Sequence, residues 1–231
     1  MSPSTFVAIR REGDNRRFFE YNPTTKQQRE LFVGVATDRC FSAPQSPFFI
    51  RTLPTAKPRV FRKSDLTLVR TLATSGEDYR APYAFTADGL SVFAQINDDY
   101  IGKVNLSTGA FSNEMNVKTP VNGSNRFYLS PDEKYLVVID RQKLSLIDLT
   151  TSSISTITPI VPNAFLYATW LQDSRRLLIS STFTVREHNV NDIESGQLLA
   201  TQCSRFESYN VCQDRSILNS IDGAPPFRID F

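Results

Sequence analysis

Apolar residues along the chain fall in short runs, and clusters of polar turn residues separate one run from the next. Residues 129–150, LSPDEKYLVVIDRQKLSLIDLT, show the unit: a Ser-Pro-Asp turn, an apolar run, a charged break and a second apolar run. Runs of this length that are rich in Val, Ile, Leu and Tyr are typical of strands, whereas hardly any stretch has helical periodicity. In this part of the chain the pattern predicts strands at about 125–129, 134–140, 143–149 and 154–159.

The unit recurs about every 42 residues. One landmark is the turn after the second apolar run, which aligns Asn22, Lys63, Asn105, Asp148, Asn191 and Asp230. Another is the turn between the first two strands of a unit, which aligns Asp88, Asp132, Asp173 and Asp214, with fainter copies near Gln45 and at SPSTFVAI. Asp and Asn suit such turns because their side chains accept hydrogen bonds from nearby backbone amides. Two landmarks with one period predict blades of four strands, the repeat of a β-propeller.

The pattern SPDEKYLVVID…LSLIDLTTSSI resembles the blades of WD-repeat and YVTN-type β-propeller proteins. The resemblance covers nearly the whole chain but concerns the fold alone, because the Trp-Asp ending, the Gly-His pair and the Tyr-Val-Thr-Asn tetrapeptide are absent. Trp170 is expected in an inner strand and is not followed by Asp. The resemblance implies an all-β fold, one β-propeller domain over 1–231 with about six four-stranded blades. The blades are expected at about 1–37, 38–75, 79–118, 124–160, 164–203 and 205–231.

The strand count predicts an incomplete seam between the first and last blades. Blade 1 begins with its second strand and blade 6 ends with its third, near 227–231, so one strand is missing from each. An exposed strand edge with apolar side chains invites pairing by another chain. The residues predicted to bind a partner at this edge are Phe6, Phe227, Ile229 and Phe231.

Three interpretations of the seam stay open. A partner inserts a strand or a blade, as in the six-bladed nuclear-pore and coat scaffolds that this layout resembles. Alternatively, the blades are irregular and TFVAIRR serves as the fourth strand of blade 6. In the third interpretation, the chain is one piece of a larger split protein.

Positive charge is concentrated in the N-terminal third of the chain. Residues 1–77 carry a net charge of +6 and residues 78–231 one of −4, within a total of +2. Two basic clusters on neighbouring blades are predicted to form a partner-binding patch: Arg10, Arg11, Arg16, Arg17, Lys57, Arg59, Arg62 and Lys63. Such a patch suits RNA phosphates or an acidic protein. The alternative is that these charges protect a strand edge and keep the protein soluble.

Residues suited to catalysis or metal binding are few. The sequence contains neither a Gly-x-Ser-x-Gly elbow nor a phosphate-binding glycine loop, and its single histidine, His188, is expected to be a packing or surface residue. Asp98 and Asp99 are weak metal candidates, because a turn between strands explains them equally well. The cysteines lack metal-site spacing and are expected as reduced thiols, with a Cys203–Cys212 disulfide as the alternative. No catalytic residue and no cofactor are expected.

The N-terminus lacks the apolar segment of a signal peptide, and no apolar run is long enough to span a membrane, so an intracellular, cytoplasmic or organellar protein is expected. The favoured function is a non-catalytic, WD-repeat-like interaction scaffold, a subunit of a larger protein or ribonucleoprotein assembly. Its partners would be one or more proteins, which donate a strand or blade at the seam, and RNA at the basic third. The alternative is a ligand-binding or enzymatic propeller, lactonase-like or lyase-like, with its site at the mouth of the central channel.

Overall fold

The protein is built of β-strands and turns throughout the part of the chain that the structure describes. The computed structural model describes the backbone of residues 5–22, 24–53, 56–72, 83–97, 100–116, 126–139, 144–157, 165–181, 184–201, 203–206, 209–212, 217–220 and 227–228. The strands form six antiparallel sheets, and consecutive strands are neighbours in each. The chain divides into two compact units, Met1–Gly123 and Ser124–Phe231, and each is described by itself.

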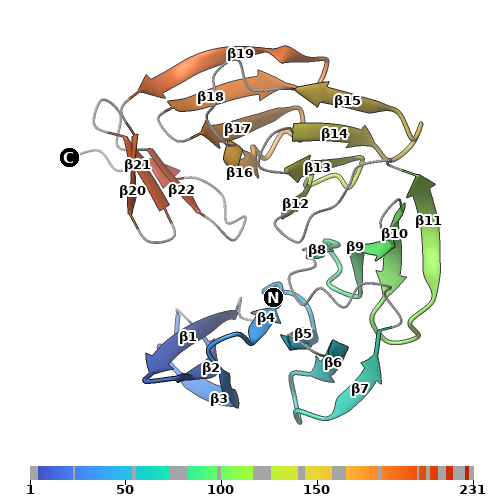
Figure 1. Ribbon diagram of the computed structural model, residues 1–231, viewed down its shortest axis with the longest axis vertical. Helices are drawn as coiled ribbons and strands as arrows, with labels where there is room; N and C mark the ends of the chain where they lie inside the picture. Colours follow the sequence, from blue (N-terminus) through green and yellow to red (C-terminus); the bar gives the residue numbers. More distant parts are fainter. Residues whose placement is uncertain are drawn as a thin grey trace. The chain divides into compact units, whose positions relative to one another are not determined.

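The first unit contains three sheets (Figure 1). The first sheet consists of β1 (Phe6–Glu12), β2 (Asn15–Tyr21) and β3 (Gln28–Val35). The second sheet consists of β4 (Arg39–Phe41), β5 (Phe48–Leu53), β6 (Ala56–Arg62) and β7 (Leu68–Thr71). The third sheet consists of β8 (Tyr83–Phe85), β9 (Ser91–Asn97), β10 (Tyr100–Asn105) and β11 (Phe111–Asn116).

The second unit contains three sheets of four strands each. The fourth sheet consists of β12 (Arg126–Leu129), β13 (Tyr135–Ile139), β14 (Leu144–Asp148) and β15 (Ile154–Ile157). The fifth sheet consists of β16 (Phe165–Trp170), β17 (Arg176–Ser181), β18 (Thr184–Asn189) and β19 (Asp192–Thr201). The sixth sheet consists of β20 (Cys203–Phe206), β21 (Tyr209–Cys212), β22 (Ile217–Ser220) and β23 (Phe227–Arg228).

The predicted organisation into six repeated units is confirmed, and so is a first unit with only three strands. The prediction that the last unit also has three strands is wrong, because Cys203–Phe206 pairs with β21 as a fourth strand. The predicted boundary falls inside this run, because the preceding blade is expected to end at Cys203 and the last blade to begin at residue 205. The residues between β20 and β21, Glu207 and Ser208, include no Gly, Pro, Asn or Asp, so the sequence gives no turn signal there.

The turn after the third strand of a sheet is closed by recurring backbone hydrogen bonds. It begins at Asn22, Arg62, Asn105 and Asp148, whose amides bind the carbonyl five residues on. In the fifth sheet the turn is shorter and begins at Asn189, which pairs with Asp192. The predicted alignment of Lys63 and Asn191 is therefore wrong, by one and by two residues. In the β6–β7 turn the side-chain acceptor has moved along the chain, since Asp65 rather than the first residue binds the amide of Thr67, at 3.0 Å.

The turn between the first two strands recurs as predicted at Asp88, Asp132 and Asp173, whose carboxylates bind backbone amides of their own turns, whereas Asp214 lies outside the described residues. The Asp88 carboxylate accepts hydrogen bonds from the Thr86 hydroxyl at 2.6 Å and from the Leu90 amide at 2.9 Å. Asp132 binds the corresponding hydroxyl and amide of its own turn. These bonds lower the pKa of Asp88, so the carboxylate is ionised in its turn and is held there by local partners.

Adjacent sheets are also tied together at these turns. Gly89 has a φ of +67°, and a methyl group added to it would lie 2.4 Å from the Ser46 Cα atom of the neighbouring sheet. The Ser46 hydroxyl donates to the Gly89 carbonyl at 2.6 Å. Glycine is therefore required here both by the backbone conformation and by the close approach of another backbone.

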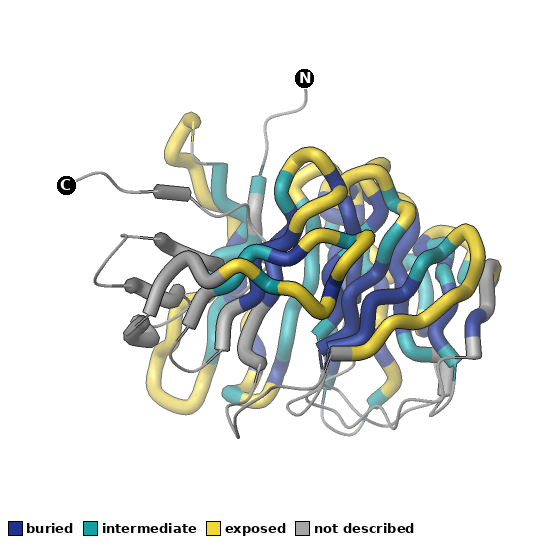
Figure 2. Tube along the Cα trace, turned by 90° about the horizontal axis from the view of Figure 1, so that it is seen from above, coloured by how far each residue is buried: buried dark blue, intermediate teal, exposed yellow. Residues whose placement is uncertain are grey.

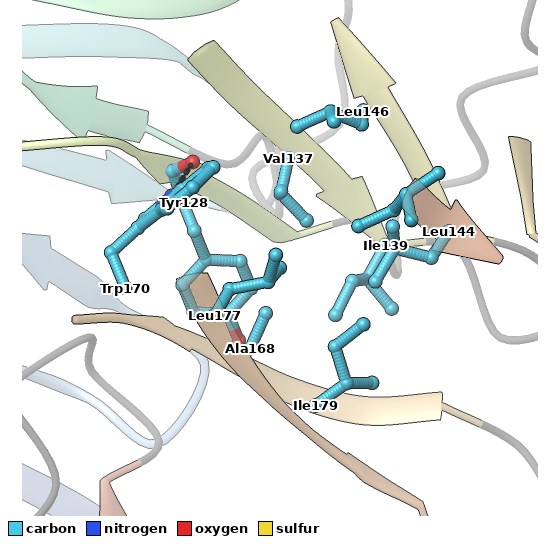
Figure 3. Close-up of a cluster of buried hydrophobic side chains, with 10 residues drawn as sticks. Tyr128, Val137, Ile139, Leu144, Leu146, Ala168, Trp170, Leu177 and Ile179 are labelled. Carbon is cyan, nitrogen blue, oxygen red and sulfur yellow. Dashed lines mark hydrogen bonds between the residues drawn. The ribbon is translucent and has the colours of Figure 1, made fainter. Parts of the chain in front are cut away.

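The two inner strands of the fourth sheet, β13 and β14, are buried on both faces. In β13 every residue after Tyr135 is buried, and in β14 every residue before Asp148. Figure 2 shows buried segments along the strands and exposed turns between them. The side chains that join the fourth and fifth sheets (Figure 3) are Tyr128, Val137, Ile139, Leu144, Leu146, Ala168, Trp170, Leu177, Ile179 and Ile193. Burial on both faces explains why these strands are continuously apolar rather than alternating.

Candidate protein-interaction site

Among the described residues, the first sheet has three strands, whereas each of the other five sheets has four. The turn that begins at Asn22 follows β2 and has the hydrogen bonds of the turns that follow the third strands elsewhere. It follows that β2 is a third strand, β3 a fourth and β1 a second. Among the described residues, no strand pairs with the outer edge of β1.

An unpaired edge exposes backbone N–H and C=O groups that can pair with another strand. On β1, Ile9 lies opposite Phe18 of β2 and is 52% exposed. Val7 lies on the same face of the strand and packs against the buried cluster around Phe18. The edge therefore offers backbone hydrogen-bonding groups and one exposed apolar side chain. These are the features of a strand-accepting surface.

The turn end of this edge carries two pairs of arginines that face each other across β1 and β2. Arg10 lies opposite Arg17, and Arg11 lies opposite Arg16. Because side chains alternate along a strand, the two pairs lie on opposite faces of the sheet. Like charges at directly opposite positions repel each other, so each pair needs compensation from elsewhere.

Only Arg17 among these four arginines has carboxylate partners in the described structure. Its guanidinium lies 2.7 Å from a Glu12 oxygen and 2.8 Å from a Glu30 oxygen, and these hydrogen bonds raise its pKa. Arg10 lies over the Phe19 ring, 5.2 Å from its centroid. Arg11 and Arg16 donate only to backbone carbonyls, at 3.4 and 3.5 Å. Three guanidinium charges beside the open edge thus have no countercharge within ion-pair distance among the described residues.

A row of four phenylalanine rings anchors this sheet to the next one. Phe18 stacks on Phe32 with centroids 4.3 Å apart, Phe32 on Phe49 at 5.9 Å, and Phe49 on Phe61 at 5.2 Å. Phe18 and Phe49 are essentially inaccessible to solvent, whereas the other two rings are partly buried. The open edge therefore belongs to a firmly packed sheet and not to a loosely attached hairpin.

A buried ion pair reinforces the same contact. Asp38, which is 1% exposed, binds Arg51 at 2.7 Å, and the Arg51 guanidinium lies 4.4 Å from the centroid of the Phe32 ring. Arg51 had not been singled out from the sequence, since neither residue belongs to a recognisable motif. Only the packing of β5 against the first sheet brings the two side chains together.

The eight basic residues predicted as one patch are divided by the structure. Lys57 and Arg59 are exposed on β6, whereas Arg62 pairs with Asp65 at 3.0 Å. Lys63 is buried, donates from Nζ to a backbone carbonyl at 2.9 Å, and has a pKa lowered by burial. The uncompensated charge beside β1 is therefore carried by the arginines of the β1–β2 hairpin.

The other predicted interaction residues are described only in part. The backbone of Phe6 pairs with Tyr21, and that of Phe227 pairs with Leu218 in the sixth sheet. Ile229 and Phe231 lie outside the described residues, as do Asp98 and Asp99. The sequence placed Cys203 and Cys212 on neighbouring strands, and their backbones are paired across β20 and β21.

His188 is a packing residue, as one of the two sequence interpretations held. It is 5% exposed, its Nδ1–H group donates to the Ile193 carbonyl at 2.8 Å, and its ring packs against Gly196. Burial lowers the pKa of the imidazole. Within the described part of the chain, no cluster of His, Cys, Asp and Glu side chains could hold a metal ion.

A polar crevice of about 420 Å³ lies between turns of the fourth and fifth sheets. Asp132 and Asp173 line it, but their carboxylates bind hydroxyl, amide or guanidinium groups of their own turns. The Ser174 hydroxyl likewise accepts a hydrogen bond from the Asp132 amide, at 3.0 Å. The crevice thus has the hydrogen bonding of two packed turns and provides no distinct catalytic arrangement.

In the described part of the structure, no helix has the length and apolar character needed to cross a membrane. Comparison of the sequence with known protein families and with curated proteins gives no match. The structure is similar to the crystal structure of TolB from Acinetobacter baumannii, with a TM-score of 0.58 and 14% sequence identity. The similarity covers 94% of this chain, which spans 61% of the TolB chain. Together with the six antiparallel sheets, this similarity shows that the chain has a β-propeller fold.

Proposed function

We propose that this protein is a non-catalytic β-propeller interaction module that docks within a larger protein assembly, and that β1 is the edge at which a partner strand pairs. The observation that carries the proposal is the three-stranded first sheet, beside five sheets with four strands each. The exposed Ile9 and the packed phenylalanine row support it. A firmly held edge with an exposed apolar side chain is suited to strand addition.

Two single substitutions form a matched pair for testing the role of this edge. Ile9 on β1 is 52% exposed, and Leu68 on β7, the last strand of a complete sheet, is 53% exposed. Both lie on strands at the edge of a sheet, and both variants replace an exposed apolar side chain with lysine. Ile9→Lys places a charge beside the open edge, and Leu68→Lys places the same charge elsewhere. At such exposed positions the free energy of unfolding should change by no more than about 0.5 kcal/mol.

The experiment compares the wild-type protein with both variants after purification from the cells that produce the chain naturally. Quantitative mass spectrometry should recover a protein partner with the wild type and with Leu68→Lys, but much less of it with Ile9→Lys. In the purified complex, amide hydrogen exchange in β1 should slow at least about tenfold, because the exposed edge amides become paired. Equal recovery with both variants, no recovered partner, or unchanged exchange in β1 would contradict the proposal.

A further inference from the structure

We propose that the segment accepted by β1 is an extended acidic segment of a partner protein, with adjacent carboxylates opposite Arg10 and Arg11 and an apolar residue opposite Ile9. This inference rests on the proposed function and adds the chemistry of the partner. It follows from the uncompensated arginines at the turn end of the edge and the exposed apolar side chain beside them.

The alternation of β1 determines where each partner side chain would lie. A residue opposite Arg11 lies on the sheet face that carries Arg16, and a residue opposite Arg10 lies on the face that carries Phe19. Directly opposite positions in a sheet have Cβ atoms about 4.5–5.5 Å apart, which a guanidinium and a carboxylate span easily. Two successive acidic residues would therefore meet one arginine on each face.

The charge distribution around the hairpin favours an acidic partner over a second copy of the chain. Glu12 and Glu30 are already engaged with Arg17, so the remaining arginines have no carboxylate within ion-pair distance in the described structure. A second copy would bring the same unpaired cations to the shared edge, and like charge across an interface is unfavourable. An acidic segment neutralises these cations while its backbone completes the sheet.

The same surface is poorly suited to a single-stranded nucleic acid. Such ligands are held largely by bases that stack on accessible aromatic side chains. Here Phe18 is 0% exposed and Phe19 is 8% exposed, and the Arg10 guanidinium covers the ring of Phe19. Phosphates would also make no use of the exposed Ile9, and because their oxygens only accept hydrogen bonds, they would leave the C=O groups of the open edge unpaired.

The probes are two fluorescein-labelled peptides, Ser-Glu-Glu-Val-Thr-Val-Thr-Ser and its reverse, which present the acidic pair to β1 in antiparallel and parallel orientation. Each has a control peptide in which lysine replaces both glutamates. An exposed arginine–carboxylate pair contributes up to about fivefold in Kd, so two pairs contribute up to about 25-fold. Fluorescence anisotropy should show one glutamate peptide binding the wild-type protein at least about tenfold more tightly than its lysine control. This preference should weaken as salt rises.

Two double variants change the net charge by the same amount at different places. Arg10→Glu/Arg11→Glu reverses the charge beside the edge, and Lys57→Glu/Arg59→Glu does so on the exposed side of β6. The first variant should reverse the preference so that the lysine peptide binds more tightly, and the second should leave it intact. Circular dichroism and thermal unfolding establish that each variant is folded.

The outcomes distinguish the acidic segment from the proposed function on which it rests. If a glutamate peptide and its lysine control bind equally and Ile9→Lys abolishes the binding of both, strand addition stands and the acidic chemistry fails. Binding that survives Ile9→Lys contradicts pairing at the edge itself. The inference is overturned if none of the peptides binds at concentrations up to about 1 mM. It is also overturned if the two double variants lose the preference for the glutamate peptide equally. Arginine-dependent binding of a uridine decamer without peptide binding would overturn it in favour of nucleic acid. Self-association of the protein seen by light scattering would overturn the inference in favour of a second copy of the chain.

Discussion

Replacing Gly89 by alanine should disrupt the contact between the second and third sheets. The added methyl group would lie 2.4 Å from the Ser46 Cα atom and 2.7 Å from the Ser46 nitrogen. Both are backbone atoms, so a change of side-chain rotamer cannot relieve the clash. Gly89 also has a φ of +67°, a conformation that alanine adopts only with strain.

The expected loss of stability has two parts that can be separated by a control. An L-residue in the left-handed conformation costs about 1–2 kcal/mol, and forcing an extra carbon into a packed contact costs about 1–3 kcal/mol more. Gly13 has a φ of +59° and nothing within 4 Å of the added methyl position, so Gly13→Ala incurs the first cost alone. Gly89→Ala should therefore lower the free energy of unfolding by about 1–3 kcal/mol more than Gly13→Ala does.

Urea unfolding followed by far-ultraviolet circular dichroism measures this difference. Fluorescence of the single tryptophan is unsuitable, because Trp170 lies in the other unit of the chain. The midpoint of Gly89→Ala should lie clearly below that of Gly13→Ala, with similar m-values for both. Equal midpoints would refute the close approach of the Ser46 backbone on which the magnitude rests.

Three further changes test the buried polar contacts. Burial lowers the pKa of His188, so the folded chain holds its proton less readily than the unfolded chain. Stability should fall as pH drops below about 6.5, and urea midpoints at high and low pH should show that His188→Gln flattens this dependence. Asp38→Asn leaves Arg51 half-buried without its partner and should cost about 2–4 kcal/mol in urea unfolding, against at most about 1 kcal/mol for Glu12→Gln at an exposed pair. Trp170→Phe removes a 2.9 Å hydrogen bond to a buried carbonyl, and thermal unfolding should show a loss of about 1–3 kcal/mol.

The repeat was predictable because its turns are built from local hydrogen bonds. Asn105 and Asp148 accept bonds from amides two and three residues on, so the residue type itself marks the turn. Where the acceptor moved to Asp65, the alignment slipped by one residue. Where no Gly, Pro, Asn or Asp stands between β20 and β21, the predicted blade boundary falls inside β20.

The candidate site was predictable only in outline. The sequence indicated an incomplete first blade, because the repeat assigns the turn at Asn22 to the end of a third strand, and it showed a basic cluster at Arg10, Arg11, Arg16 and Arg17. It could not show that Arg10 and Arg11 each lie opposite a second arginine, because that depends on the register between β1 and β2. Nor could it join Asp38 to Arg51, since that pair exists only through the packing of two sheets.

In a repeat protein, function is best sought among residues that the repeat does not require. The aspartates at 88, 132 and 148 are polar and conspicuous, yet turn hydrogen bonds account for all three. Arg10, Arg11 and Arg16 have no such role, because the first sheet would keep its turns and its phenylalanine row without them. Charged side chains on an open edge discourage indiscriminate pairing, and in the proposed complex the same charges would select a strand that carries the opposite sign. Under the proposed function, the protection of the edge and a specificity for an acidic partner would be two consequences of one arrangement.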